Sequence, residues 1–172
     1  MNRENISVLI PKSELEARIA EVGAQISRDY KDKDLTLICV LKGGVIFLAE
    51  LARRIDLDLE LDFMSISSYG TETVSSGVVK INLDISGSIE GKDVLLVEDI
   101  VDTGRSMSYV LSHLESKRPE SLKICALLDK PSRRVINVKP DYTCFVIPDK
   151  FVVGYGMDYN HKYRNLDYIG VI

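Results

Sequence analysis

Two kinds of hydrophobic pattern alternate along the chain. Near-continuous apolar runs, typical of strands buried on both faces of a parallel sheet, lie at residues 35–41, 94–97, 122–128 and 142–147. Between them, apolar residues recur three or four positions apart, as in amphipathic helices, at residues 13–30, 45–55 and 103–117. Strands that alternate with helices in this way predict an α/β fold with a central, mainly parallel sheet flanked by helices.

Shorter apolar segments are expected to add strands around this framework. They lie at residues 6–10, 57–67, 80–83 and 151–156, with an edge strand at residues 168–172. Residues 68–77 are polar, small and bounded by glycine, which predicts a loop of the kind that can serve as an active-site lid. We find no repeat, linker or low-complexity tract, so residues 1–172 are expected to form a single domain.

Capping residues predict where two of the helices begin. Ser13 is followed three positions later by Glu16, the spacing of a capping box, so Ser13 is the expected N-cap of the first helix. Thr103 is the expected N-cap of the helix that follows residues 94–97. Each helix would then start directly beyond a predicted strand.

Charge and hydropathy narrow the classes of partner. The net charge is −4, which argues against binding to nucleic acid or a membrane surface through a basic face. No apolar stretch approaches the ~18 residues of a membrane span. An anionic small ligand remains possible, because backbone N–H groups or a metal ion can hold it on an acidic protein. We therefore expect no nucleic-acid partner and no membrane partner.

The cysteine residues indicate a reducing compartment. Cys39, Cys125 and Cys144 are odd in number, widely spaced and set in apolar surroundings, and no CxxC pair is present. Such residues are expected to be buried structural thiols rather than zinc ligands or nucleophiles. Because the N-terminus also lacks the pattern of a signal peptide, we expect the protein to be cytoplasmic.

The chemistry-bearing residues follow predicted strands. In VLLVEDIVDTGRSM, residues 94–107, the strand leads to the acids Glu98, Asp99 and Asp102. The hydroxyl and glycine residues 103–106 come where a helix begins, and its unpaired N–H groups can hold a phosphate. An outward carboxylate could bind sugar hydroxyls or Mg²⁺. An ordinary capped helix after a solvated acidic turn is the alternative for this segment.

Two other strand ends carry similar residues. Lys42, Gly43 and Gly44 follow residues 35–41, and Asp129 and Lys130 follow residues 122–128. Paired glycines let the backbone approach a ligand closely, although a tight turn alone would also explain them. Because ligands bind beyond the carboxyl ends of parallel strands, all three segments are expected to converge on one face.

These segments together resemble one enzyme family. Residues 94–107 resemble the signature of the type I phosphoribosyltransferases, VLKGG at 40–44 its diphosphate loop, and SSYG at 67–70 its lid. DKFVVGYGMDYN at 149–160, followed by Arg164, resembles the base- and metal-binding segment of the hypoxanthine-guanine phosphoribosyltransferases. The resemblance implies that family's fold, with a small hood formed by the terminal segments, and a cis peptide between Leu41 and Lys42.

The resemblance also implies an activity in purine salvage. The family transfers the 5-phosphoribosyl group from 5-phosphoribosyl-1-diphosphate to hypoxanthine or guanine in the presence of Mg²⁺, and forms a nucleoside monophosphate and diphosphate. The implied partners are therefore that donor and a 6-oxopurine base. Members of the family usually associate, which implies a homo-oligomer, either a dimer or a tetramer.

The resemblance assigns roles to residues around the base. It implies that Asp102 is the general base toward N7, that Lys130 donates to O6, and that Phe151 stacks on the ring. The base-binding residues it implies are Lys130, Phe151, Val152 and Asp158. The metal ligands it implies are Glu98, Asp99 and Asp158.

Further roles concern the ribose, the phosphates and the lid. The resemblance implies that Ser68 and Tyr69 act in catalysis by closing over the leaving group. The implied contacts to ribose, 5′-phosphate and diphosphate are Lys42, Gly43, Glu98, Asp99, Asp102, Thr103, Gly104, Arg105, Ser106 and Arg164. Arg105 occupies a variable position, where it could bind phosphate or lie in solvent.

Two rival functions are weighed against this one. An adenine- or pyrimidine-specific transferase is disfavoured by Lys130 and by Phe151 with Val152. A non-catalytic regulator that senses the donor and binds nucleic acid would not need Asp102 and would need a basic face. His113 and His161 are expected to be surface residues, because no catalytic histidine is required.

Overall fold

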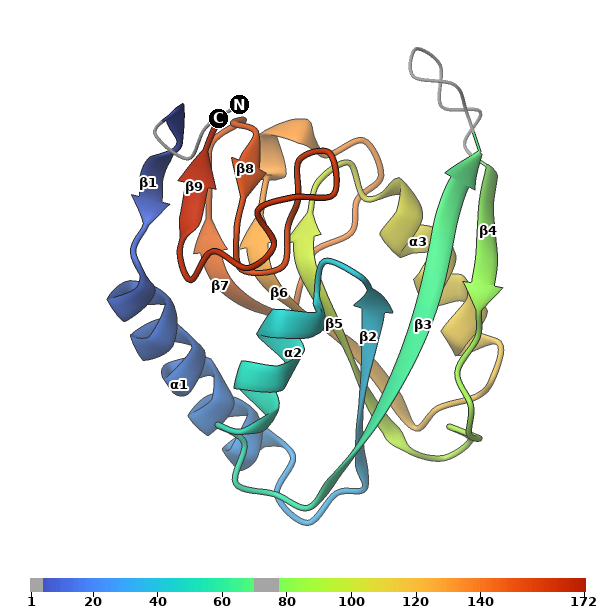
Figure 1. Ribbon diagram of the computed structural model, residues 1–172. Helices are drawn as coiled ribbons and strands as arrows, with labels where there is room; N and C mark the ends of the chain where they lie inside the picture. The colour runs from blue at the N-terminus through green and yellow to red at the C-terminus, as the bar shows by residue number, and fades with distance from the viewer. Residues whose placement is uncertain (1–4, 70–77) are drawn as a thin grey trace.

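The protein is built on a six-stranded sheet with a smaller sheet above it (Figure 1). The computed structural model describes residues 5–69 and 78–172. The strand order of the main sheet is β4-β3-β2-β5-β6-β7. Its strands are β2 (Leu35–Leu41), β3 (Leu59–Tyr69), β4 (Val78–Leu83), β5 (Asp93–Val101), β6 (Ser121–Asp129) and β7 (Tyr142–Val146). All neighbouring pairs are parallel except β3 and β4, which confirms the predicted α/β fold with a mainly parallel sheet.

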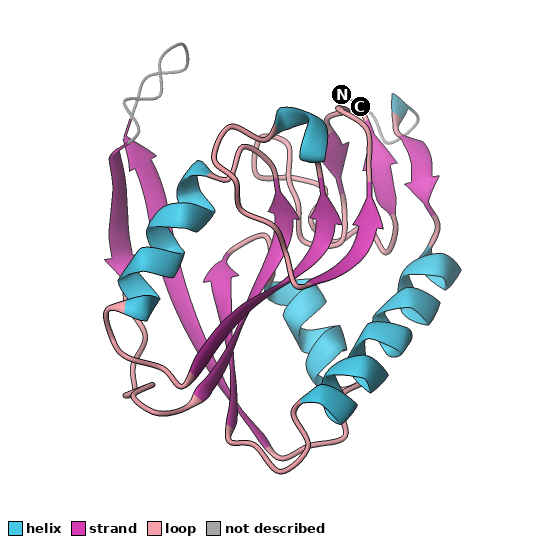
Figure 2. Ribbon diagram, turned by 180° about the vertical axis from the view of Figure 1, so that it is seen from behind, coloured by secondary structure: helices cyan, strands magenta, loops and turns pink. Residues whose placement is uncertain are grey.

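Helices cover both faces of this sheet. The helices α1 (Lys12–Asp29) and α2 (Val45–Ala52) lie on one face, and α3 (Arg105–Glu115) lies on the other (Figure 2). Along β2, Leu37 and Cys39 pack with α1 and α2, whereas Ile38 and Val40 pack with α3. A strand covered on both faces is apolar at nearly every position, and in β2 only Thr36 is polar, which explains the apolar runs. Within the described parts of the chain, none of the helices is long and apolar enough to cross a bilayer.

The predicted helix caps are wrong. Helix α1 begins at Lys12 with Pro11 as its N-cap, because the Pro11 carbonyl accepts the N–H groups of Glu14 and Leu15. Ser13 therefore lies inside the helix and does not cap it. The N-cap of α3 is Gly104, and the hydroxyl of Thr103 accepts a hydrogen bond of 3.4 Å from the Arg105 N–H.

Two strands run further than their apolar runs predict. Strand β5 continues to Val101, so the acids at 98 and 99 lie within the strand rather than beyond it. Strand β3 continues to Tyr69 because β4 pairs with it as an antiparallel neighbour, so Ser68 is also in the strand. The rest of the predicted lid, residues 70–77, and the side chains of Ser68 and Tyr69 lie outside the described residues.

The ends of the chain form the second sheet, in the order β1-β9-β8. Its strands are β1 (Ser7–Ile10), β8 (Val152–Val153) and β9 (Ile169–Val171). Strand β9 was expected at an edge but is central, because it pairs with both neighbours. This sheet lies beyond the carboxyl ends of the main strands and forms the expected hood (Figure 1).

Candidate functional site

Two neighbouring cavities lie at the carboxyl edge of the main sheet. The first has a volume of about 250 Å³ and is lined by Asp99, Ile100, Asp102, Lys130, Phe151, Val152, Met157 and Asp158. The second, of about 140 Å³, is lined by Glu98 and by residues 100–104, 106 and 107. Ile100 and Asp102 line both cavities, so the end of β5 forms a common wall between them.

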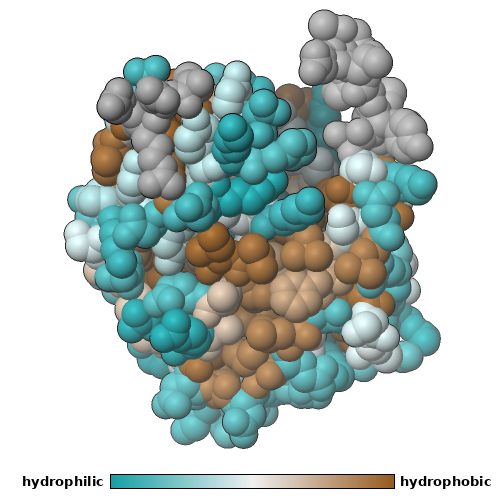
Figure 3. Space-filling view, in the orientation of Figure 1, coloured by the Kyte–Doolittle hydropathy of each residue, from teal (hydrophilic) through white to brown (hydrophobic). Residues whose placement is uncertain are grey.

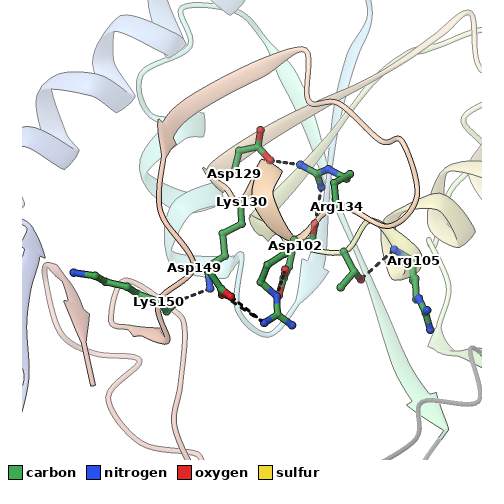
Figure 4. Close-up of polar contacts among 9 residues, drawn as sticks. Asp102, Arg105, Asp129, Lys130, Arg134, Asp149 and Lys150 are labelled. Atoms are coloured by element: carbon green, nitrogen blue, oxygen red, sulfur yellow. Dashed lines mark hydrogen bonds and ion pairs between the residues drawn. The ribbon is translucent and has the colours of Figure 1, made fainter.

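The first cavity combines a buried cation with an aromatic ring. Lys130 follows β6 and is buried, and its Nζ donates to the carbonyl oxygen of Lys150 at 2.5 Å (Figure 4). Phe151 exposes 55% of its surface and packs edge-on against Tyr159, with ring centroids 5.7 Å apart. An exposed aromatic face beside a hydrogen-bond donor suits a flat, polar heterocycle.

The second cavity is formed by the turn that opens α3. Gly104 has a φ of 82°, and a Cβ at this position would lie 2.5 Å from the Ile136 carbonyl oxygen. The Thr103 carbonyl in turn accepts the N–H groups of Val135 and Ile136, at 2.9 and 3.0 Å. The glycine is therefore required by close packing against the segment after Lys130, and the first turn of α3 leaves N–H groups for an anion.

Arg134 connects the end of β6 with the residue that follows β5. Its guanidinium pairs with the carboxylate of Asp129 and donates to the Asp102 carbonyl oxygen at 2.9 Å (Figure 4). The pair is largely buried, so removing either partner would leave a charge without compensation. Sequence reasoning missed this residue, although the basic connector that follows Lys130 was a signal for it.

Glu98 and Asp99 lie next to each other near the end of β5, one lining each cavity. Burial and, after it, the neighbouring Asp99 charge raise the pKa of Glu98 well above its ordinary value. Burial also raises the pKa of Asp99, against the lowering effect of the Ile100 N–H, which donates to it at 2.7 Å. One oxygen of Glu98, Oε2, is buried without a partner among the residues described.

The loop after β2 closes onto this acidic pair. A Cβ at Gly43 would lie only 1.6 Å from Oδ2 of Asp99. The carbonyl oxygen of Gly43 lies 2.0 Å from where a Cβ of Gly156 would stand, so the hood packs on the other side of the loop. The peptide bond between Leu41 and Lys42 is cis, as the resemblance implied.

The three acids expected to bind metal do not form one ligand group. Asp158 is paired with Arg164 at 2.6 Å, and Arg164 also donates to the Gly156 carbonyl at 2.7 Å. Over residues 5–69 and 78–172, no cluster of three or more His, Cys, Asp or Glu residues could hold a metal ion by itself. Arg164 thus holds the Asp158 carboxylate, and the assignment of Glu98, Asp99 and Asp158 as metal ligands stays a prediction. Glu98 and Asp99 still fit Mg²⁺, which is commonly held by one or two carboxylates together with substrate phosphates.

Most predicted site residues converge as expected. The residues around the first cavity are Asp99, Asp102, Lys130, Phe151, Val152 and Asp158, and those around the second include Glu98, Thr103, Gly104 and Ser106. Lys42 lies in the loop against Asp99, and Arg105 opens α3 with an exposed side chain. Sequence reasoning also missed Arg133, which forms an ion pair with Asp102 at 2.8 Å.

A helix-opening turn suited to an anion, a pair of acids and a cavity suited to a flat ring thus share the carboxyl edge of a parallel sheet. This arrangement is typical of the α/β proteins that bind phosphorylated nucleotides. Comparison with known families specifies the class further: residues 11–160 match the phosphoribosyl transferase domain. The chain belongs to the phosphoribosyltransferase family.

Individual relatives cover nearly the whole chain. The hypoxanthine phosphoribosyltransferase of Escherichia coli is 48% identical, over 99% of this chain and 97% of the relative. The hypoxanthine-guanine phosphoribosyltransferase of Streptococcus thermophilus is 47% identical, over 96% of this chain and 92% of the relative. A crystal structure of a hypoxanthine phosphoribosyltransferase from Staphylococcus aureus superposes with a TM-score of 0.93 at 44% identity, over 96% of this chain and 90% of that one.

Proposed function

We propose that this enzyme acts in purine salvage by transferring the 5-phosphoribosyl group from 5-phosphoribosyl-1-diphosphate to hypoxanthine or guanine. The observation that carries the proposal is the pair of cavities that share the wall of Ile100 and Asp102. One cavity suits a purine and the other a 5′-phosphate, and a nucleoside monophosphate joins these two groups through a ribose. The names of the relatives support the same substrates.

The first cavity would select the base. Lys130 offers a donor, so it favours a ring with an oxygen acceptor at position 6 and disfavours adenine, which has a donor there. Phe151 would stack on the ring, and the backbone of Val152 would contact its edge. Hypoxanthine and guanine both satisfy these requirements, so the cavity is expected to accept either.

Bond exchange at C1 of the ribose would complete the reaction. The C1–O bond to diphosphate breaks and its electron pair leaves with the diphosphate, while N9 of the purine forms the new bond to C1. The purine loses its proton from N7 to the carboxylate of Asp102, which lines both cavities. The 5′-phosphate would rest on the turn from Thr103 to Ser106.

Leaving-group charge would be balanced at the loop after β2. Glu98 and Asp99 would hold Mg²⁺ together with substrate oxygens, and the ion would neutralise negative charge on the diphosphate. The backbone at Lys42 and Gly43 would bind the diphosphate next to Asp99. Arg164 would contribute its charge from the hood, and Ser68 and Tyr69 would close over the site.

Two further properties belong to this proposal. The three cysteines are free and buried, which supports a reducing compartment, the cytoplasm. Apolar side chains gather over α2 and the strands beside it (Figure 3), where Val45 and Leu61 are exposed. This surface supports a homo-oligomer, either a dimer or a tetramer, which the mass of the protein in solution would test.

An assay of diphosphate release tests the function directly. The protein is incubated with 5-phosphoribosyl-1-diphosphate, Mg²⁺ and, separately, hypoxanthine, guanine, xanthine, adenine or uracil. Rapid release is expected with hypoxanthine or guanine, and little with adenine, uracil or no base. Equal rates with adenine would contradict the role of Lys130, and no release with any base would contradict the proposed function.

A further inference from the structure

The Arg133 guanidinium lies between two carboxylates, one of which, Asp102, lines the first cavity. Its Nε donates to Oδ1 of Asp102 at 2.8 Å, and its Nη1 lies 3.4 Å from Oδ1 of Asp149. Asp102 and Asp149, both labelled in Figure 4, each form an ion pair with Arg133. Asp102 lines both cavities, so Arg133 contacts the wall that the base and the phosphate would share.

The backbone places Arg133 close to the base-binding residues. It ends the short 3-10 turn Pro131–Arg133, which directly follows Lys130, and its N–H donates to the Lys130 carbonyl at 3.1 Å. Asp149 directly precedes Lys150, whose carbonyl accepts from Nζ of Lys130. Arg133 thus connects the end of β5 with the two segments that would hold the base.

Stability does not explain this ion pair. The side chains of Arg133, Asp102 and Asp149 are 46%, 37% and 54% exposed, and pairs as exposed as these contribute little to folding. The buried pair of Arg134 and Asp129 is the one that braces the fold here. Arg133 instead contacts Asp102, a side chain that lines both cavities.

We propose that Arg133 is a positioning residue, which holds Oδ1 of Asp102 so that the second carboxylate oxygen accepts the proton of the purine. A carboxylate can accept hydrogen bonds on both oxygens, so Asp102 can bind Arg133 through one oxygen and the purine through the other at the same time. This inference rests on the proposed function and extends it to a residue outside the family motifs quoted above.

A competing cation explains why such a restraint is needed. Lys130 lines the same cavity as Asp102, and it donates to the Lys150 carbonyl. Without Arg133, the Asp102 side chain would balance its charge best by turning toward Lys130. The resulting ion pair would occupy both the carboxylate that accepts the proton and the ammonium group that donates to O6. Asp149 holds the other side of the guanidinium and so keeps Arg133 on Asp102.

Steady-state kinetics of four variants test the inference. In Arg133→Gln, kcat is expected to fall about fivefold with hypoxanthine, the factor expected for one exposed ion pair, while KM for 5-phosphoribosyl-1-diphosphate stays unchanged. Arg133→Lys keeps the charge but loses the Nε–H, so it should recover part of kcat. Asp149→Asn should cause a smaller loss. Arg53→Gln removes an exposed arginine paired with Glu50 at the end of α2, and it should match the wild type.

The variant Asp102→Asn separates positioning from a general structural role. Because Arg133 acts through the Asp102 carboxylate, Arg133→Gln should cause no further loss of kcat in the Asp102→Asn background. The inference is overturned if Arg133→Gln equals the wild type, or if it lowers kcat by the same factor in both backgrounds. An inactive wild type would instead overturn the proposed function, so the two failures are distinguishable.

Discussion

Replacement of Gly43 by alanine is the sharpest test of how the site is packed. The added Cβ would lie 1.6 Å from Oδ2 and 2.6 Å from Cγ of Asp99, far inside van der Waals contact. The loop cannot retreat, because the Gly43 carbonyl already lies against Gly156. Asp99 must therefore move, although the Ile100 N–H and the Glu98 carboxyl both bind it.

The size of the effect follows from this arrangement. Overpacking of a rigid site costs about 1–3 kcal/mol, and turning Asp99 away would add to this by leaving the half-buried Ile100 N–H without its partner. For a chain of this length, a loss of about 1–3 kcal/mol lowers Tm by roughly 2–12 °C. Displacing Asp99 by about 1 Å would lower kcat/KM by roughly 100-fold.

Thermal unfolding and steady-state kinetics would measure both effects. Gly87→Ala is the matched control, because a Cβ there meets nothing within 4 Å and the residue does not have positive φ. The control should keep the wild-type Tm and kcat/KM. If Gly43→Ala also kept the wild-type kcat/KM, the contact between this loop and Asp99 would not matter for the reaction, and the reasoning would be wrong.

Three further predictions concern the proposed base, the purine contact and the thiols. Asp102→Asn should lower kcat by about 10²–10⁴-fold while calorimetry still detects binding of 5-phosphoribosyl-1-diphosphate, and full activity would refute its role as base. Lys130→Ala should lower kcat/KM for hypoxanthine and guanine at least tenfold; unchanged kinetics would refute the O6 contact. Burial raises the pKa of Cys39 and of Cys144 to about 12, and raises that of Cys125 well above its ordinary value. A thiolate-specific reagent at pH 8 should therefore label no cysteine in the folded protein and three after unfolding. These raised pKa values favour the folded state below pH ~8.5, and that contribution should fall as pH rises from ~9 toward 12.

Much of the fold could be predicted because its signal is local. Strand β2 coincides with the apolar run 35–41, since a strand covered by helices on both faces is apolar at nearly every position. The ends of helices were predicted less well. The N-caps were expected at Ser13 and Thr103, but they are Pro11 and Gly104. A cap depends on which carbonyl or hydroxyl actually reaches the first N–H groups, and residue type alone does not decide this.

The sequence by itself determined which residues lie at the strand ends, and therefore that Asp102, Lys130 and Gly43 would meet at one edge of the sheet. Only the tertiary structure decided their partners: Arg133 on Asp102, the Lys150 carbonyl on Lys130, and Asp99 against Gly43. The physical reason is the separation along the chain over which each kind of interaction acts. Strand and helix patterns repeat over a few residues, whereas these contacts join segments that approach one another only when the sheet, the connector and the hood have packed together.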